Sequence, residues 1–201
     1  MRIGVLALQG SFGEHLAILT RLGAECWAVR LPAHLADLDG LIIPGGESTT
    51  IGKLAAAYHL FEPLRAFGRQ RPLWGTCAGA IFLAKDVHTS QPLLGLMDIT
   101  IVRNAFGPQG NSFETELEVP ALAVVDDPPR PYPAVFIRAP LIEAVHGAAR
   151  VLASLPDGRI VAAEEGHLLA TSFHPELTGD DRFHRFFLHK VQQSTPASHT
   201  A

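Results

Sequence analysis

Short apolar runs alternate with amphipathic segments along the first half of the chain. Strands are predicted at "RIGVLAL", "ECWAVRL", "GLIIPGG" and "PLWGTC". After the first of them, "FGEHLAILTRLG" places apolar residues at helical spacing and ends at Gly23. A helical stretch is expected from about Thr49 to Phe67, broken near Pro63, and another over "AGAIFLAK". Such alternation is typical of a parallel sheet with helices on both faces.

The second half of the chain has a different pattern. "DITIVRN", "SFETELEV" and "AVFIRA" are extended segments without intervening helices, and "VLASLPDGRIVAAEEGHLLATSF" predicts a three-stranded meander. A last helix over "DDRFHRFFLHKV" follows a start signal at Thr178 with Asp181 three residues on. We therefore expect an α/β fold: a flavodoxin-like open, mostly parallel sheet with an antiparallel strand extension. Residues 1–191 are expected to form a single domain, and the polar residues 192–201 a disordered tail.

Composition narrows the class of protein. The 201 residues are 47% apolar and 18% charged, with a net charge of -4, which argues against nucleic acid as the main partner. No apolar run approaches the roughly 20 residues that span a bilayer, and "MRIGVLALQG" does not resemble a signal peptide, so no membrane partner is expected. Two cysteines, Cys26 and Cys77, provide no disulfide framework, which favours a cytoplasmic location.

The segment "GTCAGA", residues 75–80, holds Cys77 between glycines, after a predicted strand and before a predicted helix. This is the cysteine version of the G-x-S-x-G nucleophile elbow, in the context that the elbow requires. The following helix N-terminus favours the reactive thiolate. A buried, inert thiol is the alternative, since free cysteines are commonly buried, and the two interpretations have about equal weight on this pattern alone. Cys26 lies inside a strand with no glycine nearby and is expected to be inert.

A nucleophilic cysteine needs a base and a group that orients the base. His174 ends the strand "LLATSF", and Glu176 follows two residues later, so both side chains are expected on the same side of the segment. Glu176 is then able to fix the imidazole tautomer and stabilise the imidazolium. The other histidines are expected to be solvated or structural: His15, His34, His59, His88, His146, His167, His184, His189 and His199. No metal-ligand spacing is present, and we expect neither a metal nor another cofactor.

The segment "IIPGGEST", residues 42–49, lies at the end of the third predicted strand. Gly45 and Gly46 are able to bring backbone N–H groups close to a ligand, and one such N–H with that of Ala78 forms a candidate oxyanion hole. The same segment also reads as a plain loop that enters a helix capped by Ser48 or Thr49, and both descriptions can hold together.

Together, "GTCAG", "PGGEST" and "SFHPEL" resemble the class I, triad-type glutamine amidotransferases. More narrowly, "GVLALQGSFGEH", "PGGESTTI", "WGTCAGAIFLA", "VRNAFG", "VFIRAP" and "TSFHPELT" are similar to the glutaminase subunits of pyridoxal 5'-phosphate synthase. These segments run in order from residue 4 to residue 178. The resemblance implies hydrolysis of L-glutamine to L-glutamate and ammonia through a Cys77 γ-glutamyl thioester.

The same resemblance implies roles for particular residues. Cys77 is the nucleophile, His174 the base and Glu176 the orienting carboxylate; the residues implied to contact glutamine are Gly46, Glu47, Ser48, Arg103, Ile137 and Arg138. A guanidinium suits the carboxylate of a free amino acid and a carboxylate its ammonium group, although ordinary surface salt bridges would use the same residue types.

The family also implies a partner. It is a (β/α)8-barrel synthase subunit that uses the ammonia to build pyridoxal 5'-phosphate (vitamin B6) within a large hetero-oligomer. Docking involves the segment near Gln9, so we expect Gln9 to couple docking to the Gly45-Gly46 loop. Two segments depart from the family pattern: "RNAFGPQGNSFE", with Pro108 and Gly110, and the proline-rich "DDPPRPYP", residues 126–133, which looks like a local insertion.

Three alternatives remain at this point. One is a glutaminase subunit of another biosynthetic amidotransferase, against which "LALQGSFGEH" and "VFIRAP" argue. Another is a non-catalytic flavodoxin-like protein with a reactive cysteine, which would not need the His-Pro-Glu sequence after its last strand. The third, a cysteine peptidase or esterase with the same elbow, would not need Arg103 and Arg138 for a free amino acid.

Overall fold

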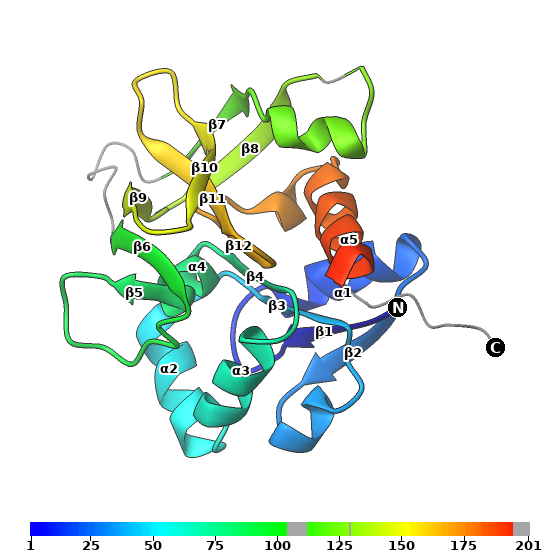
Figure 1. Ribbon diagram of the computed structural model, residues 1–201, viewed down its shortest axis with the longest axis vertical. Coiled ribbons are helices and arrows are strands. Elements are labelled where there is room, and N and C mark those ends of the chain that lie inside the picture. The colour runs from blue at the N-terminus through cyan, green and yellow to red at the C-terminus, as the bar shows by residue number, and fades with distance from the viewer. Residues whose placement is uncertain (104–111, 129, 195–201) are drawn as a thin grey trace.

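The computed structural model describes residues 1–103, 112–128 and 130–194 (Figure 1). The strands are β1 (Arg2–Leu6), β2 (Glu25–Val29), β3 (Gly40–Ile43), β4 (Leu73–Thr76), β5 (Ala84–Asp86), β6 (Met97–Val102), β7 (Ser112–Leu117), β8 (Tyr132–Ile137), β9 (Leu141–Val145), β10 (Arg150–Ser154), β11 (Ile160–Glu165) and β12 (Leu168–Thr171). The helices are α1 (Phe12–Arg21), α2 (Ser48–Ala57), α3 (Phe61–Gly68), α4 (Ala78–Leu83) and α5 (Arg182–Ser194), with short 3-10 helices η1 (Pro32–Leu35), η3 (Pro120–Val124) and η4 (Pro175–Leu177).

The main sheet has the order β2-β1-β3-β4-β12-β11-β9-β6-β5, and β10 pairs with β11. Its first five strands are parallel, whereas β11 and β9 join in antiparallel fashion. A separate antiparallel hairpin-like sheet pairs β7 with β8. The expected α/β class with a mostly parallel sheet and an antiparallel extension is therefore confirmed.

Two apolar cores lie on opposite faces of this sheet. One packs β3 and β4 residues against α2, α3 and α4, and it includes Ile43, Ile51, Leu64 and Phe82. The other packs the opposite face against α1, α5 and the β7–β8 sheet, with Trp74 and a cluster of phenylalanines at its centre. Buried strands of a parallel sheet need apolar residues on both faces, which explains the continuous burial of β3, β4 and β12.

The structure corrects several local predictions. The break between α2 and α3 lies at residues 58–60, where His59 has φ of 56°, and Pro63 falls in the first turn of α3, where its missing N–H costs nothing. The last helix begins at Arg182, so Thr178 is not its cap; the Thr178 hydroxyl instead accepts a hydrogen bond from the N–H of Asp180. The helix expected over "AGAIFLAK" ends at Leu83, and Ala84 and Lys85 belong to β5, where Ala84 pairs with Met97 of β6; strand β9 had no prediction.

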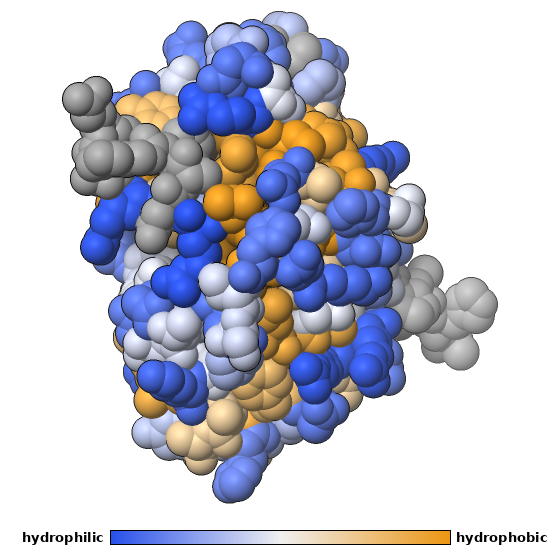
Figure 2. Space-filling model, turned by 90° about the vertical axis from the view of Figure 1, so that its left-hand side faces the viewer, coloured by the Kyte–Doolittle hydropathy of each residue, from blue (hydrophilic) through white to orange (hydrophobic). Residues whose placement is uncertain are grey.

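The last element, α5, runs to Ser194, three residues beyond the predicted domain end. Within the described ranges, no helix is long and apolar enough to cross a membrane. Seen from the left-hand side of Figure 1, apolar surface forms a band through the middle of the molecule between hydrophilic areas (Figure 2). The departure at Pro108 and Gly110 lies outside the described residues.

The proline-rich segment is tied to the start of α5 by a buried arginine. Arg182, 1% exposed, donates from Nη1 to the carbonyl of Arg130 (2.7 Å) and from Nη2 to the carbonyl of Pro131 (2.8 Å). Its guanidinium also meets the carboxylates of Asp126 and Asp180. A buried charge is stable only when it is paired in this way, so the segment is held by the body of the protein.

Candidate active site

Cys77 stands on a sharp turn between β4 and α4. Its backbone has φ of 48° and ψ of −106°, a conformation that costs a non-glycine residue about 1–3 kcal/mol. The turn brings Gly79 so close to β3 that an added Cβ would lie 1.9 Å from the carbonyl oxygen of Ile43. The strand–elbow–helix geometry predicted for "GTCAGA" is therefore present, and Cys77, 6% exposed, lines a pocket.

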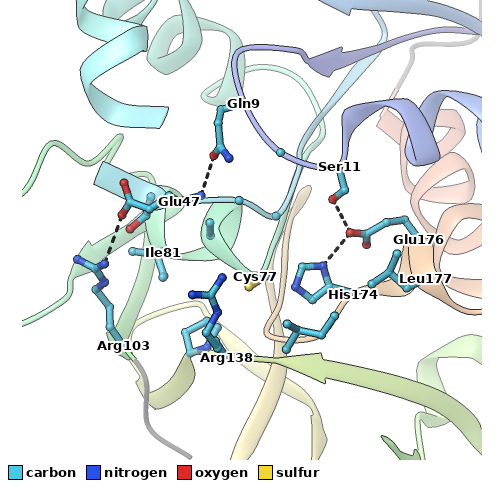
Figure 3. A pocket seen from close by; sticks show the side chains of 17 residues that line it. Gln9, Ser11, Glu47, Cys77, Ile81, Arg103, Arg138, His174, Glu176 and Leu177 are labelled. Atoms are coloured by element: carbon cyan, nitrogen blue, oxygen red, sulfur yellow. Dashed lines mark hydrogen bonds and ion pairs between the residues drawn. The ribbon is translucent and has the colours of Figure 1, made fainter. Parts of the chain in front are cut away.

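His174 reaches Cys77 because β12 lies beside β4 in parallel register. Thr171 pairs with Thr76, and the N–H of Cys77 donates to the carbonyl of Thr171 (2.8 Å). The chain leaving β12 is held by a bond from the N–H of His174 to the carbonyl of Val135 on β8. Figure 3 shows the imidazole beside the sulfur of Cys77, with Glu176 on its other side.

Glu176 orients the imidazole. His174 Nδ1 donates to Glu176 Oε1 (2.8 Å), and the hydroxyl of Ser11 donates to the same oxygen (2.5 Å). Burial alone would lower the pKa of His174, but hydrogen bonds to Cys77 and Glu176 outweigh it and raise that pKa to about 10. Burial alone would raise the pKa of Glu176, whereas the bond from His174 and the neighbouring donors lower it to about 2. The pair is thus an imidazolium and a carboxylate at neutral pH.

The glycine loop after β3 closes one side of the pocket. An added Cβ at Gly45 would lie 2.5 Å from Cε1 of His174 and 3.4 Å from Cβ of Cys77, so only glycine fits there. The carbonyl of Gly45 accepts from the N–H of Ser11 (3.2 Å), and the side-chain oxygen of Gln9 accepts from the N–H of Glu47 (2.7 Å). Two contacts from the β1–α1 segment therefore fix the peptides on either side of Gly46.

The cap of α2 differs from the prediction. Glu47, rather than Ser48 or Thr49, is the N-cap residue, and its carboxylate accepts from the N–H groups of Thr49 and Thr50. Burial would raise the pKa of Glu47, but these bonds and those from the two threonine hydroxyls lower it to about 2. Arg103 also approaches this carboxylate (3.4 Å). The oxygens of Glu47 are thus already engaged within the protein.

The two arginines of the pocket differ in how far other side chains already bind them. Arg103 donates to Gln91 (3.0 Å) as well as approaching Glu47. Arg138, at the end of β8, has φ of 44° and makes no ion pair within the part of the chain that the structure describes. Its guanidinium points into the pocket between Arg103 and His174 (Figure 3). Arg138 is therefore a cation available to an anionic ligand.

All of these groups surround one pocket of about 460 Å³. Every residue that the sequence assigned to the site lines it: Gln9, Gly46, Glu47, Ser48, Cys77, Ala78, Arg103, Ile137, Arg138, His174 and Glu176. The sequence analysis missed Ser11, and it expected His15 and His184 to be solvated or structural; both are fully buried, and Nε2 of His15 lies 3.5 Å from Oε2 of Glu176. The four-residue spacing of Ser11 and His15, which puts them on one helical face, was the available signal.

No set of three or more His, Cys, Asp or Glu side chains within residues 1–103, 112–128 and 130–194 is arranged to hold a metal ion. What the geometry offers is a thiol on a strained elbow, an imidazolium held by a carboxylate, and a cation at a distance from them. An arrangement of this kind defines the α/β enzymes that attack a carbonyl carbon with a cysteine thiolate.

Comparison with known proteins narrows the class. The chain belongs to the SNO glutamine amidotransferase family, whose model matches residues 5–193. It is 57% identical over 193 residues to a protein of Herpetosiphon aurantiacus named pyridoxal 5'-phosphate synthase subunit PdxT, covering 94% of this chain and 99% of that one. A protein of the same name from Dehalococcoides mccartyi is 56% identical, over 94% of this chain and 96% of the relative. A solved structure described as a glutamine amidotransferase has a TM-score of 0.87 at 47% identity, covering 94% of this chain and 98% of that one.

Proposed function

We propose that this protein is the glutaminase subunit of a pyridoxal 5'-phosphate synthase, with Cys77, His174 and Glu176 as its catalytic triad. It hydrolyses L-glutamine to L-glutamate and ammonia. The observation that carries the proposal is the placement of His174 between the thiol of Cys77 and the carboxylate of Glu176, on the floor of a pocket that Arg138 enters.

The reaction begins with the Cys77 thiolate, which attacks the side-chain amide carbon of glutamine. The negative charge moves to the amide oxygen, where the N–H groups of Gly46 and Ala78 stabilise it. Ala78 is the first residue of α4, so its N–H has no partner within the helix. His174 gives its proton to the leaving nitrogen, the C–N bond breaks, and ammonia leaves a γ-glutamyl thioester.

Water completes the cycle. His174, now neutral, takes a proton from a water molecule as its oxygen attacks the thioester carbon, and the C–S bond breaks to release glutamate and the thiolate. Glu176 keeps the Nε2 of His174 directed at the reacting atoms through the bond to Nδ1, and it stabilises the imidazolium in both steps. No cofactor is needed for either step.

Substrate recognition uses the charges at the pocket wall. We assign the α-carboxylate of glutamine to Arg138, which has no competing carboxylate among the described residues, with Arg103 beside it. Because the carboxylate of Glu47 caps α2, it contributes negative charge near the α-ammonium group of glutamine without a direct bond to it. Gly46, Ser48 and Ile137 line the pocket and contact the substrate mainly through their backbone atoms.

The ammonia passes to a synthase subunit. The relatives' names place them in a pyridoxal 5'-phosphate synthase, and we propose a (β/α)8-barrel partner in a large hetero-oligomer located in the cytoplasm. Both cysteines of the chain are free thiols, as a reducing compartment would keep them. Gln9 contacts the loop after β3, and we propose that docking at this segment adjusts the Gly46 peptide.

Glutamate release from glutamine tests this function. The purified chain is assayed with and without a pyridoxal 5'-phosphate synthase subunit, with Cys77→Ala as the blank and Cys26→Ala as the matched cysteine control. We expect release that rises with the partner, vanishes in Cys77→Ala and persists in Cys26→Ala. No release from a folded, partner-bound chain would overturn the glutaminase assignment, and release indifferent to the partner would overturn the pathway alone.

A further inference from the structure

Two buried histidines lie beneath the triad and take no part in the reaction described above. His15 on α1 and His184 on α5 are both 0% exposed, and Nδ1 of His15 lies 2.9 Å from Nε2 of His184. The ring of Trp74 packs edge-on against both imidazoles. On its other side, Nε2 of His15 lies 3.5 Å from Oε2 of Glu176. The histidine pair therefore adjoins the triad carboxylate.

The two carboxylate oxygens of Glu176 differ in their hydrogen bonding. Oε1 accepts hydrogen bonds from His174 and Ser11, whereas Oε2 is buried and has no hydrogen-bond donor among the residues that the structure describes. A buried carboxylate oxygen without a donor is costly. Nε2 of His15 lies 3.5 Å from Oε2, and the same nitrogen lies 3.4 Å from the hydroxyl of Thr76 on β4. His15 is thus the donor nearest to the vacant acceptor.

His15 and His184 are both neutral, and this limits where the proton of each imidazole can lie. Burial lowers the pKa of His15 to about 4, assisted by the positive charge of His174 and opposed by Glu176 and Glu14. Burial likewise lowers the pKa of His184, with His15 and Arg21 acting in the same direction and Glu176 against it. Each ring is therefore neutral at pH 7 and carries a single proton on one of its two nitrogens.

One arrangement of those two protons satisfies the neighbours best. If His15 carried its proton on Nδ1, its Nε2 could accept from the hydroxyl of Thr76, but the same lone pair would face the Glu176 carboxylate, and His184 would bury an unpaired Nδ1–H. If both rings are protonated on Nε2, His184 donates to Nδ1 of His15 and His15 donates toward Oε2 of Glu176. The atom left unpartnered is then Nδ1 of His184, which carries a lone pair and not a proton.

We propose that His15 is a positioning residue for the triad, whose Nε2–H holds Oε2 of Glu176 while His184 fixes the tautomer and ring orientation of His15. The resulting chain of hydrogen bonds runs from α5 through α1 to η4 and ends at the imidazole of His174. Ser11 and His15 approach the carboxylate from the same helix, so α1 supplies a donor to each oxygen of Glu176. This inference rests on the proposed roles of Cys77, His174 and Glu176.

Two variants of His15 test it. His15→Leu keeps the volume and removes the donor, whereas His15→Gln places an amide N–H near the position of imidazole Nε2. Loss of a hydrogen bond to a charged group predicts a kcat for glutamine, measured with a synthase subunit, that is roughly 10- to 100-fold lower in His15→Leu, with KM little changed. His15→Gln is expected to recover most of that loss, and a merely structural role would not produce this split.

A second readout uses the chain alone and needs no turnover. The rate of Cys77 alkylation by iodoacetamide is followed against pH by mass spectrometry, with Cys26 as the internal reference. When Glu176 is no longer held, the His174 imidazolium is less stabilised, so half-maximal alkylation should move up by about one pH unit in His15→Leu. An unchanged profile in His15→Leu, or a His15→Gln variant as impaired as His15→Leu, would overturn the proposal.

If His15→Leu does not fold, the imidazole tautomers of the wild-type protein test the proposal instead. Long-range proton–nitrogen NMR spectra of the imidazoles at pH 7 should place the proton of both His15 and His184 on Nε2, and a proton on Nδ1 of His15 would contradict the proposal. Wild-type glutamate release, measured in parallel, separates the two ideas. Absence of release overturns the glutaminase assignment, whereas normal release with the wrong tautomer overturns only the role of His15.

Discussion

The imidazole Nδ1 of His174 donates to the carboxylate Oε1 of Glu176 over 2.8 Å, two residues along the same segment. The bond is buried, with the Glu176 side chain 0% exposed and that of His174 11% exposed. Both members are charged at neutral pH, because hydrogen bonds to Cys77 and Glu176 raise the pKa of His174 and the bond from His174 lowers the pKa of Glu176. The relationship therefore ties the stability of the fold to the protonation of the site.

Stability should consequently peak near pH 6.5. The pKa of His174 is raised to about 10, so its contribution is complete below 6.5 and is lost as pH rises toward 10. The pKa of Glu176 is lowered to about 2, so its contribution is complete above 4.5 and is lost as pH falls toward 2. The pKa of His15 is lowered to about 4, so stability also falls as pH drops from 6.5 to 4. Urea unfolding between pH 3 and 10 measures this, and the alkaline decline should shrink in His174→Gln. If the free energy of unfolding falls equally steeply above pH 6.5 in wild type and in His174→Gln, His174 is not the group that titrates.

Gly45 should not tolerate even one methyl group. In Gly45→Ala the new Cβ would meet the imidazole of His174, which must then shift away from Cys77. A displacement of this size predicts a fall in kcat of roughly 100-fold. Gly13→Ala on α1 is the matched control, because an added Cβ there meets no atom of the described residues within 4 Å, and it should keep full activity. Steady-state glutaminase assays measure kcat for both variants, and thermal melts show whether each is folded. A fully active Gly45→Ala would show that a side chain at this position does not displace His174.

Arg138 should govern affinity more than rate. Removal of a guanidinium that pairs with the substrate carboxylate predicts a roughly 10- to 100-fold rise in KM for glutamine in Arg138→Ala, with kcat little changed. Arg159→Ala, in the turn between β10 and β11 where Arg159 pairs with Asp157, should leave both parameters near wild type. A rise in KM of equal size in the two variants would remove Arg138 from substrate binding.

Gln9 should affect activation by the partner. Its side-chain oxygen holds the N–H of Glu47 at 2.7 Å, so Gln9→Ala frees the peptide next to Gly46. We expect the synthase subunit to stimulate glutamate release from Gln9→Ala roughly 2- to 10-fold less than from wild type, since one lost hydrogen bond between neutral groups is of that order. Gln70→Ala, after α3 and exposed, is the control and should respond normally. If Gln9→Ala binds the subunit and is stimulated fully, Gln9 has no coupling role.

Motifs with a fixed local geometry could be predicted from the sequence. The elbow at Cys77 and the pair of His174 and Glu176 each depend on residues within a few positions of one another, so their spacing carries the information. The alternation of strands and helices likewise predicted the parallel sheet.

Contacts between distant segments could not be predicted in this way. His15 and His184 are 169 positions apart, and each alone looks like one histidine among ten. The cap of α2 was misassigned because Ser48 and Thr49 are better cap formers by residue type, whereas the chain after β3 is still extended at Glu47, whose carboxylate accepts from the N–H groups of Thr49 and Thr50. Strand β9 was missed because it pairs with segments remote in sequence, and the edge strand β5 was missed because it follows α4 directly and pairs with β6 over only a few residues.

The insertion of β12 between β4 and β11 has a consequence for the order in which the protein is made. The indole of Trp74, on the strand before the nucleophile, donates to the hydroxyl of Thr171 across 97 positions of sequence. A chain emerging from the ribosome therefore exposes its thiol long before the neighbouring strand exists to bring a base beside it. We therefore expect glutamine hydrolysis only after β12 has been translated and has paired with β4, so that incomplete nascent chains consume no glutamine.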